Sequence, residues 1–440
     1  MSNDSLENYF QGALSFLENN QEKETVFGEK YKGEWPGEMA LTTTYIFIGR
    51  KRKARDSNCF TVSAIHNFLA EMYLEDPSLG RIKPMLKNAF EEIKTYESNK
   101  EFHFWKKLPP NRKLSLFKNP DTLHLVSRPT NFKLRSRFIN NTANVPADAD
   151  DTSLGNLAFH YQNSIFGTNH KIANAHTFDK WHDTNRKNRQ WYNFHFLQKE
   201  ETNAYLTWLH PEHEYKRWNS VKMSINTFFI FMPGSTARPK AYKPWVPFGS
   251  NDVDIVVNAN ILSYLAITNQ TENSTIASQS AAFLNQLSTK ERYWDEAIYY
   301  PNSFHAFYAW ARAYRHDGGI NEKAALQMAK DLTELQQADG SFQSSRFLKG
   351  NDPIQATAYG LHAMLDLKEK GISIPDSNLD NAVSFLLNHA KVSEQGVHWE
   401  GGVFFSGGTV LRNILLWKSD AYTTALIARC IQKYQKNAYF

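Results

Sequence analysis

Cysteine is nearly absent from this chain of 440 residues, which contains only Cys59 and Cys430. Two cysteines cannot build a disulfide framework or a cysteine-rich metal centre, and they favour a reduced, cytoplasmic protein. Long apolar runs are also lacking, because the most apolar stretch, residues 225–232, is too short to span a bilayer. The first residues lack the basic and apolar regions of a secretion signal. We therefore expect neither a membrane span nor a signal peptide.

A strong charge of one sign is missing as well. Fifty Lys and Arg side chains oppose 45 Asp and Glu side chains, which leaves a formal net charge of +5. This weak excess gives no indication of nucleic-acid binding. Aromatic residues are abundant, in contrast, with 30 Phe, 20 Tyr and 11 Trp, and hydrophobic residues make up 41% of the chain. We expect a large core, and some of these rings to have a function beyond packing.

Two kinds of helix alternate along the sequence. The first kind opens with Asp, Asn or Ser, which caps the free amides of a helix N-terminus, and contains many small residues. The second kind is amphipathic, with long apolar side chains at helical spacing. This alternation predicts an all-α protein, a single α/α barrel over residues 1–440, with inner and outer rings of helices and loop insertions. The ranges expected in the inner ring are 151–161, 254–265, 302–314, 352–365 and 420–431, and those expected in the outer ring are 275–287, 324–337 and 379–390.

A second repeat joins the end of a helix to an aromatic ring further along the chain. An apolar pair late in a helix is followed by a ring, mostly after a glycine turn, and the last three copies start about fifty residues apart. These copies resemble the glutamine–tryptophan motifs of the squalene–hopene cyclase and class II terpene cyclase superfamily. Two copies lack the glutamine, and Phe342 replaces tryptophan in one. The copies are Phe16, Leu17, Gln21, Gly33 and Trp35; Phe283, Leu284 and Trp294; Leu332, Gln336, Gly340 and Phe342; and Phe385, Leu386, Gly396 and Trp399.

The sharpest motif is an acidic cluster, Asp148-Ala-Asp150-Asp151-Thr152, preceded by Pro146. It is similar to the Asp-x-Asp-Asp-Thr motif of class II terpene cyclases. Three neighbouring carboxylates repel one another, so burying them raises the pKa of at least one. A carboxylic acid kept protonated in a dry, apolar pocket is what protonation of an alkene or epoxide requires. The resemblance implies that Asp150 donates the proton, and that Asp148 and Asp151 orient and acidify it.

A simpler interpretation of this cluster stays open. One carboxylate could cap a helix that begins near Thr152, with the other two in solvent. Two metal-binding interpretations fail on spacing. A calcium loop starting at Asp148 would need glycine and glutamate where Ser153 and Phe159 stand, and an Asp-Asp-x-x-Asp motif would need aspartate in place of Leu154. We therefore predict no metal ligands in this motif.

The resemblance implies a fold and a reaction. The fold is an (α/α)6-type barrel like one domain of the larger cyclases, with no second barrel in this chain. The reaction is protonation-initiated cyclisation of a linear isoprenoid, such as farnesyl or geranylgeranyl diphosphate, with squalene, another triterpene precursor or a meroterpenoid precursor as alternatives. It also implies a histidine that hydrogen-bonds the acid, which the sequence does not identify.

Cation stabilisation and diphosphate binding would need further residues. Aromatic faces stabilise a migrating positive charge without reacting with it, and we name Trp310, Phe404 and Trp417 as candidates from a larger pool that includes Tyr300 and Tyr422. Arg186 and Arg189 could bind a diphosphate, and Mg²⁺ would then accompany the substrate. The basic residues 50–55 could do the same or contact anionic lipid headgroups.

Two rival functions belong to other classes. A carbohydrate-active α/α barrel would combine the acidic cluster with a second carboxylate across a groove, for which Glu296, Asp339 and Glu400 are candidates. A non-catalytic α/α toroid that binds a partner or lipid would leave the cluster at the surface as a helix cap. The Pro- and Gly-rich residues 225–247 could cover a cavity or touch a membrane surface in peripheral contact.

Overall fold

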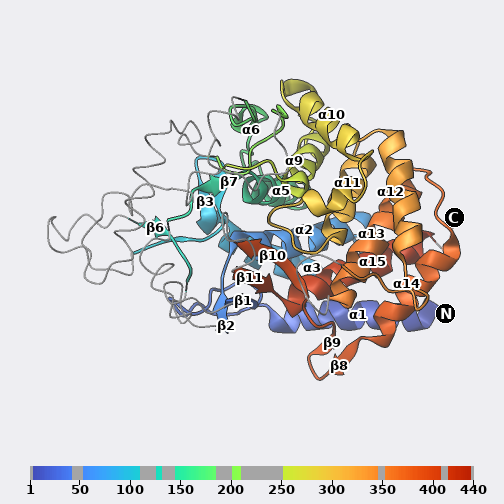
Figure 1. Ribbon diagram of the computed structural model, residues 1–440. Coiled ribbons are helices and arrows are strands. Elements are labelled where there is room, and N and C mark those ends of the chain that lie inside the picture. Colours follow the sequence, from blue (N-terminus) through green and yellow to red (C-terminus); the bar gives the residue numbers. More distant parts are fainter. Residues whose placement is uncertain are drawn as a thin grey trace, which may run out of the picture.

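The computed structural model describes residues 3–41, 53–109, 125–130, 144–184, 201–209, 251–344, 352–407 and 415–437. Within these residues, six helices form a closed ring, in which each packs against the next and the last packs against the first (Figure 1). All five ranges predicted for the inner ring lie in it. The ring consists of α2 (Cys59–Glu75), α5 (Ala149–Phe166), α9 (Ile255–Ile267), α11 (Phe304–Arg315), α13 (Pro353–Glu369) and α15 (Asp420–Asn437).

A second layer of helices covers this ring, and the three ranges predicted for the outer ring lie in it. Helix α1 (Asn3–Asn20) packs on α15, and α3 (Ile82–Ile93) packs on α2 and α5. Helix α10 (Ala277–Leu287) packs on α9, α12 (Glu322–Leu335) on α11 and α13, and α14 (Asp376–Asn388) on α13 and α15. Short helical segments are α6 (His176–Asp179), η1 (Lys94–Tyr96), η4 (Thr271–Asn273) and η5 (Tyr293–Glu296).

The chain also contains antiparallel strands, so the all-α prediction holds only for the barrel itself. A four-stranded sheet in the order β10-β11-β1-β2 lies at one end of the barrel, opposite the labelled chain ends (Figure 1). The strands have two to five residues, too few for an alternating pattern to be recognised in sequence. They are β1 (Gly37–Leu41), β2 (Lys53–Asp56), β3 (Glu97–Ser98), β4 (Glu101–His103), β5 (Lys107–Leu108), β6 (Val126–Ser127), β7 (Ala147–Asp148), β8 (Lys391–Ser393), β9 (Gly396–His398), β10 (Val403–Gly407) and β11 (Leu415–Lys418).

Hydrogen bonds from the repeat motifs tie outer helices to the turns that follow them. The Gln21 side chain donates to the carbonyl oxygen of Gly33 at 3.0 Å, and the Gln336 side chain donates to that of Gly340 at 3.0 Å. Both glycines have positive φ, 95° and 86°, which a residue with a side chain rarely adopts. The indole of Trp399 donates to the carbonyl oxygen of Leu386 at 2.6 Å. The repeats therefore fix helix ends, as their spacing indicates.

A hydrogen bond and a ring packed over a glycine fix the position of the inner helix α5. The backbone amide of Phe102 donates to Thr152 Oγ1 at 2.9 Å, and the Phe102 ring lies directly over Gly155. Helix α13 repeats this arrangement with other residues at the same spacing: Phe342 donates to Thr357 at 3.0 Å, and its ring lies over Gly360. Since Thr152 and Gly155 belong to α5, this contact fixes the helix that carries the acidic cluster.

We predict that Gly155→Ala destabilises the protein. A Cβ at this position would lie 2.6 Å from the Phe102 ring, so the ring or the helix must shift. Overpacking of this kind costs about 1–3 kcal/mol and outweighs the better helix propensity of alanine. Urea unfolding measures the loss. Gly80→Ala is the matched control, because a Cβ there meets nothing closer than 3.9 Å, and equal stability of the two variants would contradict the prediction.

Buried and partly buried ion pairs join the C-terminal halves of four inner helices. The Glu71 carboxylate accepts from Arg312 at 2.7 Å and from the Tyr161 hydroxyl at 2.9 Å. Burial alone would raise the pKa of Glu71, but the positive charges of Arg312 and Arg429 lower it below its ordinary value. The network comprises Glu71 and Glu75 of α2, Arg312 and Arg315 of α11, Asp366 and Glu369 of α13, and Arg429 and Lys433 of α15.

Among the described helices, none combines the length and apolar character that crossing a bilayer requires.

Candidate active site

The acidic cluster forms the first turn of α5. Asp148 is the N-cap residue, and its side chain accepts from the backbone amide of Asp151 at 2.8 Å. Strand β7 holds the cap in place by pairing Asp148 with Phe102 of β4. The side chains of Asp148, Asp150 and Asp151 are all buried, with residue exposures of 6%, 4% and 2%. A carboxylate does cap the helix, but the other two are enclosed in protein rather than in solvent.

Asp150 is held by two side chains from distant parts of the chain. Asn260, in the middle of α9, donates from Nδ2 to Asp150 Oδ1 at 2.7 Å, and the Tyr300 hydroxyl contacts Oδ2. Burial raises the pKa of Asp150 well above its ordinary value, and the charges of Asp148 and Asp254 add to this rise. The Asn260 hydrogen bond opposes it. Oδ1 accepts from an amide N–H, so a proton held by this carboxyl would sit on Oδ2.

Asp148 and Asp151 interact with each other beside Asp150. Burial raises the pKa of Asp151 well above its ordinary value, and the neighbouring charges of Asp148 and Asp150 raise it further. The buried Cys59 thiol, at the start of α2, opposes this rise as a hydrogen-bonding group. Burial also raises the pKa of Asp148, against hydrogen bonds from Asp151 and from backbone amides. The cluster therefore retains protons at pH values at which free aspartates are ionised.

Asp254 is the other carboxylate whose charge acts on Asp150. It caps α9 and accepts from the backbone amides of Val256 at 2.7 Å and Ile298 at 2.6 Å. Two more amides, those of Val257 and Tyr299, donate to it at 3.2 and 2.9 Å. With this set of donors, Asp254 is suited to fix the loop that carries Tyr300 rather than to exchange protons.

Aromatic side chains meet across the barrel axis beside Tyr300. The Tyr300 ring centroid lies 4.3 Å from that of His305, and His305 lies 4.4 Å from Tyr359. The Tyr359 and Tyr422 hydroxyls are 2.9 Å apart. Burial lowers the pKa of His305 to about 3, so this imidazole is neutral near pH 7 and does not repel a cation. Further rings of this cluster are Phe60, Phe68, Tyr308, His362 and Phe404.

The three predicted aromatic residues lie in different places. Phe404 belongs to the axial cluster, with ring centroids 4.6 Å from Tyr422 and 5.4 Å from Phe60. Trp417, on β11, contacts the cluster through Phe405, and the ring centroids of Trp417 and Phe405 are 5.3 Å apart. Trp310 points away from the axis: it stacks on the ring of Tyr293 at 4.9 Å and donates to a backbone oxygen of α9.

Trp417 also binds a buried carboxylate. Its indole nitrogen donates to Asp56 Oδ2 at 2.8 Å, and the indole of Trp105 donates to Asp56 at 3.1 Å. Burial raises the pKa of Asp56 to about 6 against these hydrogen bonds. Asp56 thereby fixes two indole rings at the end of the barrel that carries the acidic cluster.

This carboxylate predicts a pH effect on stability. Between its ordinary pKa of 3.8 and about 6, folded Asp56 holds a proton that the unfolded chain has released. The contribution of Asp56 to the free energy of unfolding therefore falls as pH rises through this window. We expect wild-type protein to lose stability relative to Asp56→Asn between about pH 4 and pH 6. Urea unfolding of both proteins measures the difference, and parallel curves across the window would contradict the prediction.

The remaining predicted residues are outside the axial cluster or outside the described residues. Arg186 and Arg189, as well as residues 225–247, lie outside the described residues. Asp339 is exposed in the turn after α12 and accepts from Ser341, and Glu400 is exposed and pairs with Lys391 at 3.0 Å. Glu296 ends η5. In the parts of the chain that the structure describes, no three His, Cys, Asp or Glu side chains form a metal site.

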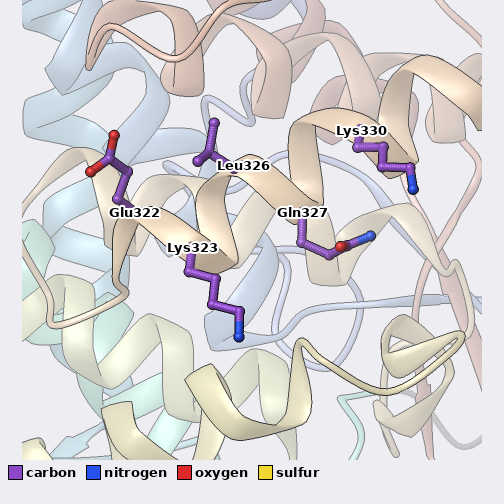
Figure 2. A pocket seen from close by; sticks show the side chains of 5 residues that line it. All are labelled: Glu322, Lys323, Leu326, Gln327 and Lys330. Atoms are coloured by element: carbon purple, nitrogen blue, oxygen red, sulfur yellow. The ribbon is translucent and has the colours of Figure 1, made fainter.

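An open hollow on the outside of the barrel contains none of the residues of the acidic cluster. Figure 2 shows its lining side chains, all from the outer helix α12. They are Glu322, Lys323, Leu326, Gln327 and Lys330.

The contacts of Asn260 and Tyr300 with Asp150 were not predicted from the sequence. A signal for Asn260 exists: it is one of two asparagines in the otherwise apolar sequence Ile255-Val-Val-Asn-Ala-Asn-Ile-Leu262, and a buried amide requires a partner. Its neighbour Asn258 binds the backbone of Tyr205 at 2.9 Å. Among the described residues, the direct partners of the Asp150 carboxyl are an amide and a phenol, where the resemblance implied a histidine.

Comparison with known proteins identifies the fold. Neither a protein-family model nor a curated protein sequence matches the chain. A solved structure of a protein from Actinoplanes is similar over 98% of this chain and 99% of its own, with a TM-score of 0.54 and 12% identity. A second similar structure is a variant of the type II terpene cyclase MstE from Scytonema in complex with its substrate geranylgeranyl dihydroxybenzoate. The match covers 98% of this chain and 98% of that chain, with a TM-score of 0.52 and 12% identity. A third similar structure is cellobiose 2-epimerase from Bacillus thermoamylovorans. The match covers 99% of this chain and 100% of that chain, with a TM-score of 0.51 and 10% identity.

The chain shares its fold with these proteins. At 10–12% identity the likeness extends to the barrel and not to a particular substrate or reaction. It agrees with the closed inner ring and its covering helices.

Proposed function

We propose that this protein is a class II isoprenoid cyclase in which Asp150 is the general acid. The observation that carries the proposal is the state of the Asp150 carboxyl, which is buried, held at Oδ1 by Asn260 and at Oδ2 by Tyr300, and raised in pKa. An alkene is a very weak base, so its protonation needs an acid that keeps its proton until the substrate has displaced water.

The proposed reaction begins at Asp150 Oδ2. The π electrons of a substrate double bond form a C–H bond with the acidic proton, which leaves a carboxylate on Asp150 and a cation on the neighbouring carbon. A second double bond attacks this cation and closes a ring, and loss of a proton to a base ends the sequence. Asn260 and Tyr300 stabilise the carboxylate by hydrogen bonds, and the faces of Phe60, Phe404 and Tyr422 stabilise the positive charge.

The substrate proposed is a linear prenyl diphosphate of farnesyl or geranylgeranyl length, with a triterpene or meroterpenoid precursor as the alternative. The meroterpenoid alternative is supported by the likeness to MstE, whose substrate is geranylgeranyl dihydroxybenzoate and whose chain is covered over nearly its whole length. For a diphosphate, we propose Arg186 and Arg189 as the binding residues, with Mg²⁺ bound to the substrate.

Product analysis tests this proposal. Purified protein is incubated with farnesyl diphosphate, geranylgeranyl diphosphate, geranylgeranyl dihydroxybenzoate and squalene, with and without Mg²⁺, and the products are analysed by mass spectrometry. We expect a cyclic isomer of one substrate, and a diphosphate substrate is expected to keep its diphosphate. Loss of diphosphate without protonation, or no turnover of any substrate by folded protein, would contradict the proposal.

A carbohydrate-active enzyme is a second candidate, favoured by the likeness to cellobiose 2-epimerase. Two of its candidate carboxylates, Asp339 and Glu400, are exposed and bound to their own neighbours at the surface. Incubation with cellobiose distinguishes this candidate, because epimerisation or hydrolysis of the disaccharide would replace the cyclase proposal.

A further inference from the structure

His362 is a buried histidine of the axial cluster to which the proposed reaction assigns no step. It lies on α13 and is 1% exposed. Its Nδ1 atom is 3.2 Å from Asp366 Oδ2, one turn further along the same helix, whereas its Nε2 atom has no hydrogen-bond partner among the described residues. A buried polar atom without a partner costs free energy, so a free nitrogen at this place indicates a function.

The contact with Asp366 determines which nitrogen of His362 is free. Lys433 Nζ contacts the Asp366 carboxylate, and its charge lowers the pKa of Asp366 well below the ordinary value, although burial alone would raise it. An ionised carboxylate only accepts hydrogen bonds, so Nδ1 of the neutral imidazole donates to Asp366 and Nε2 keeps its lone pair. Burial lowers the pKa of His362 against the charge of Asp366, and the charges of Lys433 and Arg429 add to this fall. His362 is therefore a neutral imidazole with a free acceptor nitrogen near pH 7.

His362 lies deeper in the barrel than the rings that adjoin the acid. Tyr300, which contacts the acid, packs on His305 and through it on Tyr359. Tyr308 and His362 follow His305 and Tyr359 by three residues on α11 and α13, which is nearly one helical turn, or about 5 Å along the axis. The Tyr308 ring centroid lies 5.7 Å from that of His305 and 4.9 Å from that of His362. Successive ring contacts therefore lead from the acid to His362.

Side chains along this path retain a small exposed surface inside the barrel. Asn260, which binds the acid, is 5% exposed, and Tyr308 and Phe68, which pack on His362, are 6% and 4% exposed. Trp310, which points away from the axis on the same helix as Tyr308, is 0% exposed. The residual surface therefore belongs to the axial side, where a hydrocarbon chain would run from the acid past Tyr308 to His362.

We propose that His362 Nε2 is the base that ends the cyclisation, with Asp366 as its positioning residue. The inference rests on the proposed function, because only an enzyme that forms a carbocation needs a base to remove the charge. The C–H bond beside the last cation breaks, its electron pair becomes the double bond of the product, and the proton goes to Nε2. Asp366 stabilises the imidazolium that results. One proton has entered from Asp150 and one has left to His362, so the product is an isomer of the substrate, and exchange with solvent after product release resets both groups.

His305 is a second imidazole of the axial cluster with a free nitrogen, because its Nδ1 atom has no partner among the described residues. It lies against Tyr300, where the first cation forms rather than the last. Burial lowers the pKa of His305 to about 3 against a hydrogen bond with the Phe404 backbone, and no carboxylate contributes. A C–H bond next to a carbocation is far more acidic than an imidazolium, so a weak base suffices for the last step. The place of His362 and its carboxylate partner favour it over His305.

Product analysis of His362 variants tests the assignment. His362→Gln keeps an amide that can donate to Asp366, and His362→Phe keeps a ring against Tyr308, but both remove the basic nitrogen. His66→Gln is the matched control. His66 is also fully buried, its Nε2 atom has no partner among the described residues, and its Nδ1 atom lies 3.1 Å from Asn67 Oδ1, but it is outside the axial cluster, on α2.

The variants are compared with the wild-type enzyme on the substrate that it cyclises, by chromatography and mass spectrometry. We expect both His362 variants to consume this substrate within about threefold of the wild-type rate, because protonation by Asp150 precedes the step that needs the base. Most of their product is expected to be a cyclic alcohol, formed when water attacks the last cation, or cyclic alkenes with the double bond at another carbon. His66→Gln is expected to give the wild-type rate and product.

Three results would overturn the assignment and leave the proposed function in place. The wild-type product from both folded His362 variants would place the base elsewhere, and a changed product from His305→Gln alone would place it at His305. Slower consumption with the wild-type product and a lowered melting temperature would mean that His362 supports only the packing. Absence of cyclisation by the wild-type enzyme would overturn the proposed function and this assignment together.

Discussion

Asp150→Asn is expected to reduce cyclisation by about a thousandfold or more while leaving the fold intact. A positioned general acid contributes about 10²–10⁴ to a rate, and the other carboxyls lack the contacts with Asn260 and Tyr300 that Asp150 has. Because burial keeps Asp150 protonated, a neutral amide of nearly the same shape leaves no buried charge unpaired. We therefore expect a melting temperature close to that of the wild type, measured together with product formation.

The matched control makes the same chemical change at another aspartate. Asp339→Asn is expected to keep the wild-type rate, because Asp339 is exposed in the turn after α12. Loss of activity in Asp339→Asn but not in Asp150→Asn would contradict the assignment of the acid and favour the carbohydrate enzyme.

Glu71→Leu is expected to produce the largest loss of stability. Glu71 accepts hydrogen bonds from Arg312 and Tyr161 and faces Arg429. Removing this carboxylate leaves buried guanidinium groups with less compensating charge, which typically costs about 3–5 kcal/mol. Urea unfolding at pH 7 measures the loss.

The double variant Glu71→Leu/Arg312→Met separates loss of the pair from loss of packing. Removal of both partners takes away the uncompensated charge, so we expect the double variant to recover part of the stability lost by Glu71→Leu alone. Exposed ion pairs contribute at most about 1 kcal/mol to stability. If Glu71→Leu lowers the free energy of unfolding by less than this, solvent compensates the charges, and the prediction that burial makes this pair important is wrong.

The barrel could be predicted from the sequence because its signals are local. Helix caps such as Asp254, runs of small residues and the spacing of apolar side chains mark each inner helix within a single segment. The acidic cluster is local too, so its place in the first turn of α5 follows from its sequence. The two-to-five-residue strands leave no such pattern, because their residues pair with partners far along the chain, as Met39 does with Trp417.

The partners of the acid could not be predicted because they depend on closure of the ring. Asn260 lies 110 residues and Tyr300 150 residues from Asp150 in the sequence. The packing of α5 on α9 brings Asn260 to Asp150, and the hydrogen bonds of Asp254 hold the loop that carries Tyr300. The direction of the Trp310 side chain could not be predicted from the sequence either. It lies two positions from Tyr308, which places it on the opposite face of α11, and the sequence pattern does not reveal which face of an apolar helix points to the axis.

Transfer of a solvent-derived proton through Asp150 is the central claim, and deuterium labelling tests it most directly. Asp150 exchanges its acidic proton with solvent, so enzyme equilibrated in D₂O transfers deuterium to the carbon that is protonated first. We predict that the cyclic product formed in D₂O carries one deuterium on a carbon of the former terminal double bond, and that Asp150→Asn forms neither this product nor the label. A cyclic product without deuterium, or a labelled product from Asp150→Asn, would contradict the account.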